Sequence, residues 1–171
     1  KMSKLPYIQP ERELHYNLGV LLLVISGLAV TKKRKKVLNL DKIQSFYFLT
    51  TRPSLLNSVL KLANKNQILI EERDYYTVGT LSPNVEELFD RERILTMLKI
   101  LASKDFLSVE YSNNDGFLFD LTDIGKNKAS ELTEGYFQRI SSFIKLLSEL
   151  QSQTPSKLNG YINSALKQEA Q

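Results

Sequence analysis

A run of 13 apolar or small residues, Leu18–Val30, constrains the fold more than any other feature of this sequence. A helix that spans a membrane needs about 20 such residues, and the charged residues from Glu11 to Glu13 stop the run from extending upstream. A signal peptide carries its positive charge before its apolar stretch, whereas the dense basic cluster here follows it. We therefore predict a buried central helix from Glu11 to about Ala29, and no membrane segment.

Two glycines and a histidine of this helix carry further expectations. Gly19 and Gly27 lower helix propensity, so we expect that they allow another helix to pack closely. His15 is the one histidine of the chain. On a core helix, it is predicted to be a packed, hydrogen-bonded residue and not a catalytic base.

The composition excludes most enzyme classes. The 171 residues include no Cys and one His, which excludes disulfides, cysteine nucleophiles and any zinc site that needs thiolates or two imidazoles. The seven glycines lie too far apart for a GxGxxG or Walker A loop. No acidic residue is followed two positions later by Lys, so the E-x-K core of one common nuclease family is missing. We predict a cytoplasmic non-enzyme with no catalytic residue, no metal and no cofactor.

Charge is unevenly distributed along the chain. Residues 1–65 carry 12 basic and 3 acidic side chains, residues 66–135 carry 7 and 14, and residues 136–171 carry 4 and 2. This asymmetry predicts one basic and one acidic face, which fits two different partners. Three interpretations stay open for the densest basic site: a non-specific contact with the DNA backbone, a dock for an acidic protein, and a solvated loop. That site consists of Lys32, Lys33, Arg34, Lys35 and Lys36.

Two alternating stretches predict a β-hairpin over residues 106–121. The apolar residues of each stretch share one face, and they are Leu107, Val109, Tyr111, Phe117, Phe119 and Leu121. Between the stretches, Ser112–Gly116 has strong turn chemistry. A helix predicted at 94–103 precedes the hairpin, and a helix capped by Thr122 follows it, which together make a winged-helix pattern with the apolar face of the hairpin on the helices. We predict a mainly α fold with a small β-hairpin: a winged-helix-like domain over residues 1–132 and a C-terminal helical extension over residues 133–171.

The charges of this predicted wing indicate which partner it contacts. A DNA reader offers Lys and Arg from its recognition helix and its wing. The predicted hairpin contains no basic residue, whereas Glu110, Asp115 and Asp120 lie within it. Such a surface repels phosphate more than it attracts it. We predict that the wing contacts protein.

A heptad seam marks the long helix predicted at 134–151. Its members are spaced 4, 3, 4 and 3 residues apart, and they are Tyr136, Ile140, Phe143, Leu147 and Leu150. Two heptads are too short for an independent coiled coil. The stripe therefore packs on its own domain, or on a partner or second copy, and these five residues are the candidate partner-binding residues.

Several stretches together resemble a known family. Asn17–Leu23 leads into Leu28–Lys36, Leu81–Glu92 comes later, and Leu121–Gly125 follows. With these stretches, the chain resembles the middle components of bacterial ABC-three-component conflict systems, over most of residues 14–132. That group includes the small subunit of Lamassu-type anti-phage and anti-plasmid defence.

The resemblance implies a non-catalytic adaptor. In such systems, an SMC-like ABC ATPase senses DNA and an effector subunit, often a nuclease, does the damage. The middle component binds the ATPase and helps to hold the effector inactive until DNA engages. The alternative is a winged-helix DNA-binding transcription regulator that dimerises through its C-terminal helix. An adaptor co-purifies with a large coiled-coil ATPase, whereas a regulator dimerises alone and prefers a DNA sequence.

Overall fold

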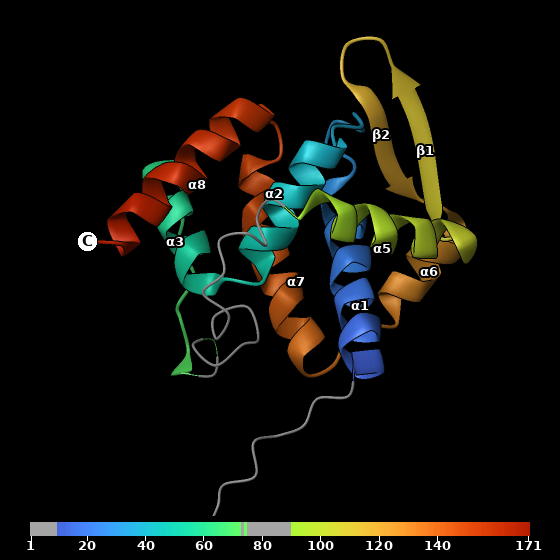
Figure 1. Cartoon of the computed structure of the whole chain (residues 1–171), viewed down its shortest axis with the longest axis horizontal. Coiled ribbons are helices and arrows are strands. Elements are labelled where there is room, and N and C mark those ends of the chain that lie inside the picture. Colours follow the sequence, from blue (N-terminus) through green and yellow to red (C-terminus); the bar gives the residue numbers. More distant parts are fainter. Residues whose placement is uncertain (1–9, 73, 75–89) are drawn as a thin grey trace, which may run out of the picture.

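The computed structural model describes residues 10–72, 74 and 90–171 (Figure 1). These residues form seven α-helices and one antiparallel two-stranded sheet. In chain order, the elements are α1 (Pro10–Leu28), α2 (Leu40–Thr50), α3 (Pro53–Leu62), α5 (Arg91–Ser103), β1 (Leu107–Ser112), β2 (Gly116–Leu121), α6 (Asp123–Ser130), α7 (Tyr136–Leu147), a 3-10 turn (Ser148–Leu150) and α8 (Pro155–Glu169). The prediction of a mainly α fold with a small β-hairpin is confirmed.

Helix α1 forms the centre of the core, as its apolar run predicts. Its residues Val20, Leu21, Val24 and Ile25 are 0% exposed, because α2, α5, α6, α7 and β2 all pack around it (Figure 1). Among the described residues, no helix is long and apolar enough to cross a membrane. His15 is exposed, so the prediction of a packed histidine is wrong: it lies near the start of α1, before the fully buried part of the helix.

Two glycines of α1 allow α7 to pack closely against it. A Cβ atom on Gly19 would lie 2.8 Å from the ring of Phe137, and one on Gly27 would lie 2.4 Å from the Cγ2 atom of Ile144. Real Cβ atoms essentially never approach another heavy atom so closely. The expected use of these glycines in helix packing is therefore confirmed.

The hairpin forms in the predicted place. Its strands pair with Leu107 opposite Leu121 and Tyr111 opposite Phe117. The turn between them ends at Gly116, which has a φ of 73°, a conformation that glycine adopts without steric cost. The backbone N–H of Phe119 also donates to the carbonyl oxygen of Leu38 at 2.9 Å, so the segment between α1 and α2 lies along the outer edge of β2.

A cap joins the hairpin to α6, as predicted from Thr122. The hydroxyl of Thr122 accepts a hydrogen bond from the N–H of Gly125 at 3.0 Å and donates one to the carbonyl of Asp105 at 2.6 Å. A Cβ atom on Gly125 would lie 2.3 Å from the carbonyl oxygen of Phe106. The chain therefore needs glycine at position 125 to bring α6 against the base of the hairpin.

Two further helices begin with a capped first turn. Helix α2 is capped by Asn39, whose side chain accepts from the N–H of Lys42. Helix α5 begins at Arg91 under an Asp90 cap, upstream of the predicted start at residue 94.

A single cluster of buried side chains contains residues on both sides of position 132. Helix α7 packs mainly on α1, and α8 packs on α3 and α2. The core is therefore shared between the two parts that the sequence suggests, and their division into residues 1–132 and 133–171 stays a prediction.

Candidate interaction surfaces

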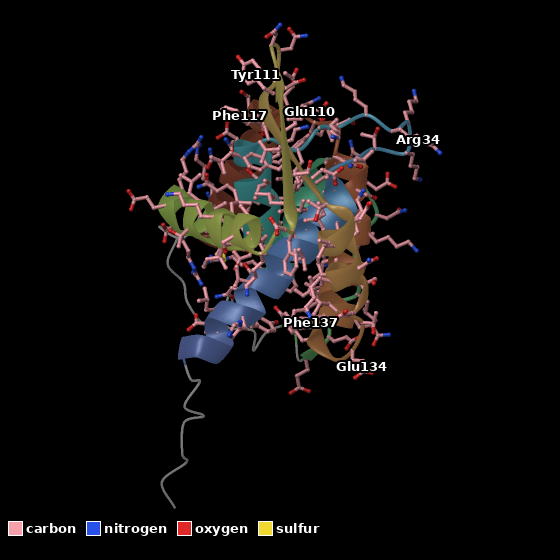
Figure 2. All side chains as sticks on the ribbon, turned by 90° about the vertical axis from the view of Figure 1, so that its right-hand side faces the viewer. Arg34, Glu110, Tyr111, Phe117, Glu134 and Phe137 are labelled. Carbon is pink, nitrogen blue, oxygen red and sulfur yellow. The ribbon has the colours of Figure 1, made fainter. Side chains whose placement is uncertain are left out.

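The basic cluster occupies a tight turn that follows α1. Val30 and Lys36 form an isolated antiparallel bridge. Within the turn, the N–H of Thr31 donates to the carbonyl of Lys35 at 2.9 Å, and the N–H of Arg34 donates to the carbonyl of Thr31 at 2.8 Å. We call residues 31–36 the basic loop. Figure 2 shows Arg34 at the outer end of this loop, far from the helical core.

Four side chains of the basic loop, at positions 32 to 35, are exposed. The fifth, Lys36, pairs its ammonium with the carboxylate of Glu110 on β1. That hydrogen bond raises the pKa of Lys36. Four of the five predicted nucleic-acid-binding residues are therefore exposed together on the loop, whereas the fifth, Lys36, forms an ion pair with the hairpin.

The hairpin exposes an aromatic face. Val109, Tyr111 and Phe117 are 50%, 65% and 61% exposed, and the rings of Tyr111 and Phe117 meet edge to face with centroids 5.4 Å apart. We call these three residues the hairpin face. Figure 2 shows Tyr111 and Phe117 on one side of the hairpin and Glu110 on the other, toward the basic loop.

The position of this face corrects the prediction that the apolar side of the hairpin packs on the helices. Leu118 and Asp120, on the opposite side of β2, are buried instead. The prediction holds for the half of the face nearest the base of the hairpin, where Leu121 lies in the core and Leu107 and Phe119 pack against it. Leu118 is the one signal in the sequence for this orientation, since it places an apolar residue between two phenylalanines and marks β2 as apolar on both faces.

The predicted partner-binding stripe on α7 faces the interior. Four of its members are 0% exposed, and they are Ile140, Phe143, Leu147 and Leu150. The fifth, Tyr136, is largely buried against α1, where its ring centroid lies 4.8 Å from that of Tyr16. The structure therefore shows the first of the two alternatives, in which the stripe packs on its own domain. Little of the surface of these residues is exposed to a partner.

The stability of the protein should depend on pH in the alkaline range because of Tyr136. Burial raises the pKa of Tyr136 from 10.0 to about 12. The folded state keeps this phenol neutral while the unfolded state ionises it, so the free energy of unfolding is unaffected below the unfolded pKa and falls between about pH 10 and about pH 12, by about 1.4 kcal/mol per pH unit. Urea unfolding of the wild type and of Tyr136→Phe as a function of pH measures the difference, because the substitution removes this contribution. Parallel curves for the two proteins would contradict the assignment.

An ion pair that sequence reasoning missed fixes α7 to the segment after α3. The guanidinium of Arg139 donates to both carboxylate oxygens of Asp74, at 3.1 and 2.6 Å, and to the carbonyl of Leu69 at 2.6 Å. It also lies over the ring of Phe143, 4.9 Å from the centroid. The side chains of Arg139 and Asp74 are 13% and 3% exposed.

Within residues 10–72, 74 and 90–171, no group of three His, Cys, Asp or Glu side chains could hold a metal ion. The described part of the chain presents the basic loop on one side and the hairpin face on another.

A comparison with known protein families decides where such a chain belongs. Residues 28–160 match the family described as ABC-three component (ABC-3C) system Middle Component 4. The chain belongs to this family. The match includes both the basic loop and the hairpin, so the two surfaces lie in the part of the chain that defines a middle component 4 protein.

Membership of this family also identifies the kind of partner. A middle component is one part of a multi-component system, so the chain partners with the other components of an ABC-3C system. No curated protein matches the chain, and no solved structure matches it.

Proposed function

We propose that this middle component is a non-catalytic, cytoplasmic adaptor in an antiviral defence complex of the Lamassu type, which holds an effector subunit, often a nuclease, on an SMC-like ABC ATPase. The observation that carries the proposal is the hairpin face of a chain in the middle component family: three large apolar side chains, each at least half exposed, on a ribbon that stands out from the helices (Figure 1). Contiguous exposed apolar side chains mark protein interaction sites.

The composition of the hairpin face favours protein over nucleic acid as its partner. Tyr and Phe are enriched at the centres of protein interfaces, where they bury large areas at a low entropic cost. The hairpin carries no Lys or Arg, and the carboxylate of Asp115 lies at its turn, where it would meet phosphate in a duplex. The order of α5, hairpin and α6, with Leu38 bonded along β2, supports the winged-helix assignment as part of this proposal.

Replacing both aromatic residues of the hairpin face tests the adaptor proposal. We expect Tyr111→Ser with Phe117→Ser to weaken binding to the ABC ATPase by more than about tenfold, since each buried aromatic side chain contributes about 1.5–3 kcal/mol. Co-purification of the ATPase with the tagged middle component, followed by titration of the purified pair, measures the loss. The matched control is Ile124→Ser on α6, which removes a side chain that is 58% exposed and lies outside the hairpin.

Both variants should stay folded, because the altered side chains are exposed; the double variant should melt slightly lower, since it loses the contact between the two rings. An ATPase complex that survives the double substitution unchanged would rule out the hairpin face as the docking surface. A middle component that dimerises alone and prefers one DNA sequence would instead favour the transcription regulator.

The basic loop supports a second function, a non-specific contact with DNA. Its four exposed cations lie on a hydrogen-bonded turn, and the loop itself contains no carboxylate that would repel phosphate. Neutralising four phosphates gives a slope of about −3.6 for the logarithm of the binding constant against that of the salt concentration. We expect a variant with Ser at positions 32 to 35 to lose this slope in a salt titration of duplex binding without unfolding. If that variant still binds the duplex, the basic loop is not the DNA contact, and the remaining interpretations are a dock for an acidic protein and a solvated loop.

A further inference from the structure

A cleft separates the basic loop from the segment that joins α7 to α8. Its volume is about 750 Å³, within the range of about 300–1,000 Å³ that is typical of small-molecule sites. It lies beside the hairpin turn, and Asp115 of that turn forms part of its wall. Four lysines line it: Lys32, Lys33, Lys35 and Lys42. We call it the lysine cleft.

Lys42 is the feature of the lysine cleft that needs a physical explanation. It is 7% exposed on the first turn of α2, and its ammonium donates one hydrogen bond, to the carbonyl of Gln151 at 2.9 Å. An ammonium has three donors. In the part of the chain that the structure describes, this ammonium forms no ion pair with a carboxylate.

A buried cation without an ionic partner destabilises the folded state. Burial lowers the pKa of Lys42 accordingly; Asp115 attracts the ammonium and Lys35 repels it, and the loss of water outweighs the attraction. A neutral side chain at position 42 would avoid this cost, yet the sequence has a lysine there. An anion in the lysine cleft would compensate it.

The other residues of the lysine cleft indicate the class of anion. The four lysines face two carboxylates, those of Asp115 and Glu149, so two positive charges remain uncompensated. Lysine ammonium groups bind phosphate as point charges, and a ligand with several phosphates carries the charge that the excess requires. Val30, Val37 and Pro155 add an apolar wall on which a flat ring could lie.

We propose that the lysine cleft binds a small polyphosphate ligand, either a nucleotide or an inorganic polyphosphate, with its phosphates between Lys42 and the lysines of the basic loop. This site goes beyond the adaptor role and is independent of the hairpin face. A DNA duplex does not fit the description, because Lys42, the residue that most needs an anion, is buried, whereas the loop cations that a duplex would meet first are exposed.

Calorimetric titration of the full chain with sodium tripolyphosphate, with ATP and with a short DNA duplex tests the proposal. We expect saturable binding of tripolyphosphate or ATP and a loss of about tenfold or more in Lys42→Met, since a hydrogen bond to a charged group is removed. The matched control is Lys126→Met on α6, which removes an exposed lysine outside the cleft and should bind like the wild type. Lys42→Met replaces an uncompensated buried charge with an apolar side chain of similar length, so it should melt at or above the wild-type temperature without ligand.

The arms of the titration identify the source of the phosphates. Tighter binding of ATP than of tripolyphosphate assigns a nucleotide, and equal binding assigns an inorganic polyphosphate. The proposal is overturned if neither compound binds at millimolar concentration, if Lys42→Met binds them as the wild type does, or if only the duplex binds and the substitution leaves that binding unchanged.

Discussion

Phe143→Asp combined with Leu147→Asp is expected to unfold the protein. Both side chains are 0% exposed in the contact between α7 and the rest of the core. Their removal loses about 1.5–3 kcal/mol each in apolar burial. The substitutions also place two carboxylates in the core, where the cation beside position 143, Arg139, already pairs with Asp74, and this burial of charge adds several kcal/mol. Together, these losses approach or exceed the about 5–15 kcal/mol that stabilise a whole domain.

Circular dichroism during heating measures this effect. The double variant should lack a cooperative transition, whereas the control, Gln138→Asp with Ser141→Asp, should melt close to the wild type. The control adds the same two charges to exposed positions of the same helix. If the Phe143 and Leu147 variant melts like the wild type and loses only a complex or a dimer, α7 leaves the core in solution, and the partner-binding role predicted for its stripe is restored.

The heptad seam illustrates how far the sequence determines this fold. Spacings of 4 and 3 correctly predict a helix with one apolar face, because those positions lie on one side of an α-helix. These spacings do not indicate which element covers the face. Gly19 and Gly27 give part of the answer, because two glycines on the central helix predict that another helix packs closely there. The structure identifies that helix as α7.

The hairpin was predictable in its strands and turn but not in its orientation. Alternation determines which side chains share a face, and the turn residues determine where the chain reverses. Which face is buried depends on the burial of Leu118, a tertiary effect that the sequence signals only by an apolar residue between two phenylalanines. The hairpin face therefore emerges only from the structure.

The lysine cleft and the engagement of Lys36 could not be predicted because they join distant parts of the chain. Lys36 meets Glu110 across 74 positions, and Lys42 meets Gln151 across 109. The charge pattern correctly marks the basic loop as an exposed site. However, the pattern does not distinguish Lys36, which pairs with the hairpin, from the other four cations of the loop. It also gives no sign that Lys42, outside the loop, is buried beside them.

Arg139→Leu is expected to destabilise the protein by about 3–5 kcal/mol, because it removes the guanidinium that pairs with both oxygens of a buried carboxylate. Asp74 is 3% exposed, so water cannot replace the guanidinium. The substitution also removes the hydrogen bond to the carbonyl of Leu69 and the contact with the ring of Phe143. Urea unfolding at neutral pH measures the change in the free energy of unfolding.

The matched control is Lys128→Leu, which breaks the exposed ion pair between Lys128 and Glu131 on α6. An exposed pair contributes about 0.2–1 kcal/mol, so this variant should unfold close to the wild type. Adding Asp74→Leu to Arg139→Leu should recover much of the lost stability, since the buried carboxylate is then removed along with the guanidinium. A loss in Arg139→Leu no larger than that in Lys128→Leu would show that the pair is solvated, and that the segment around Asp74 detaches from α7 in solution.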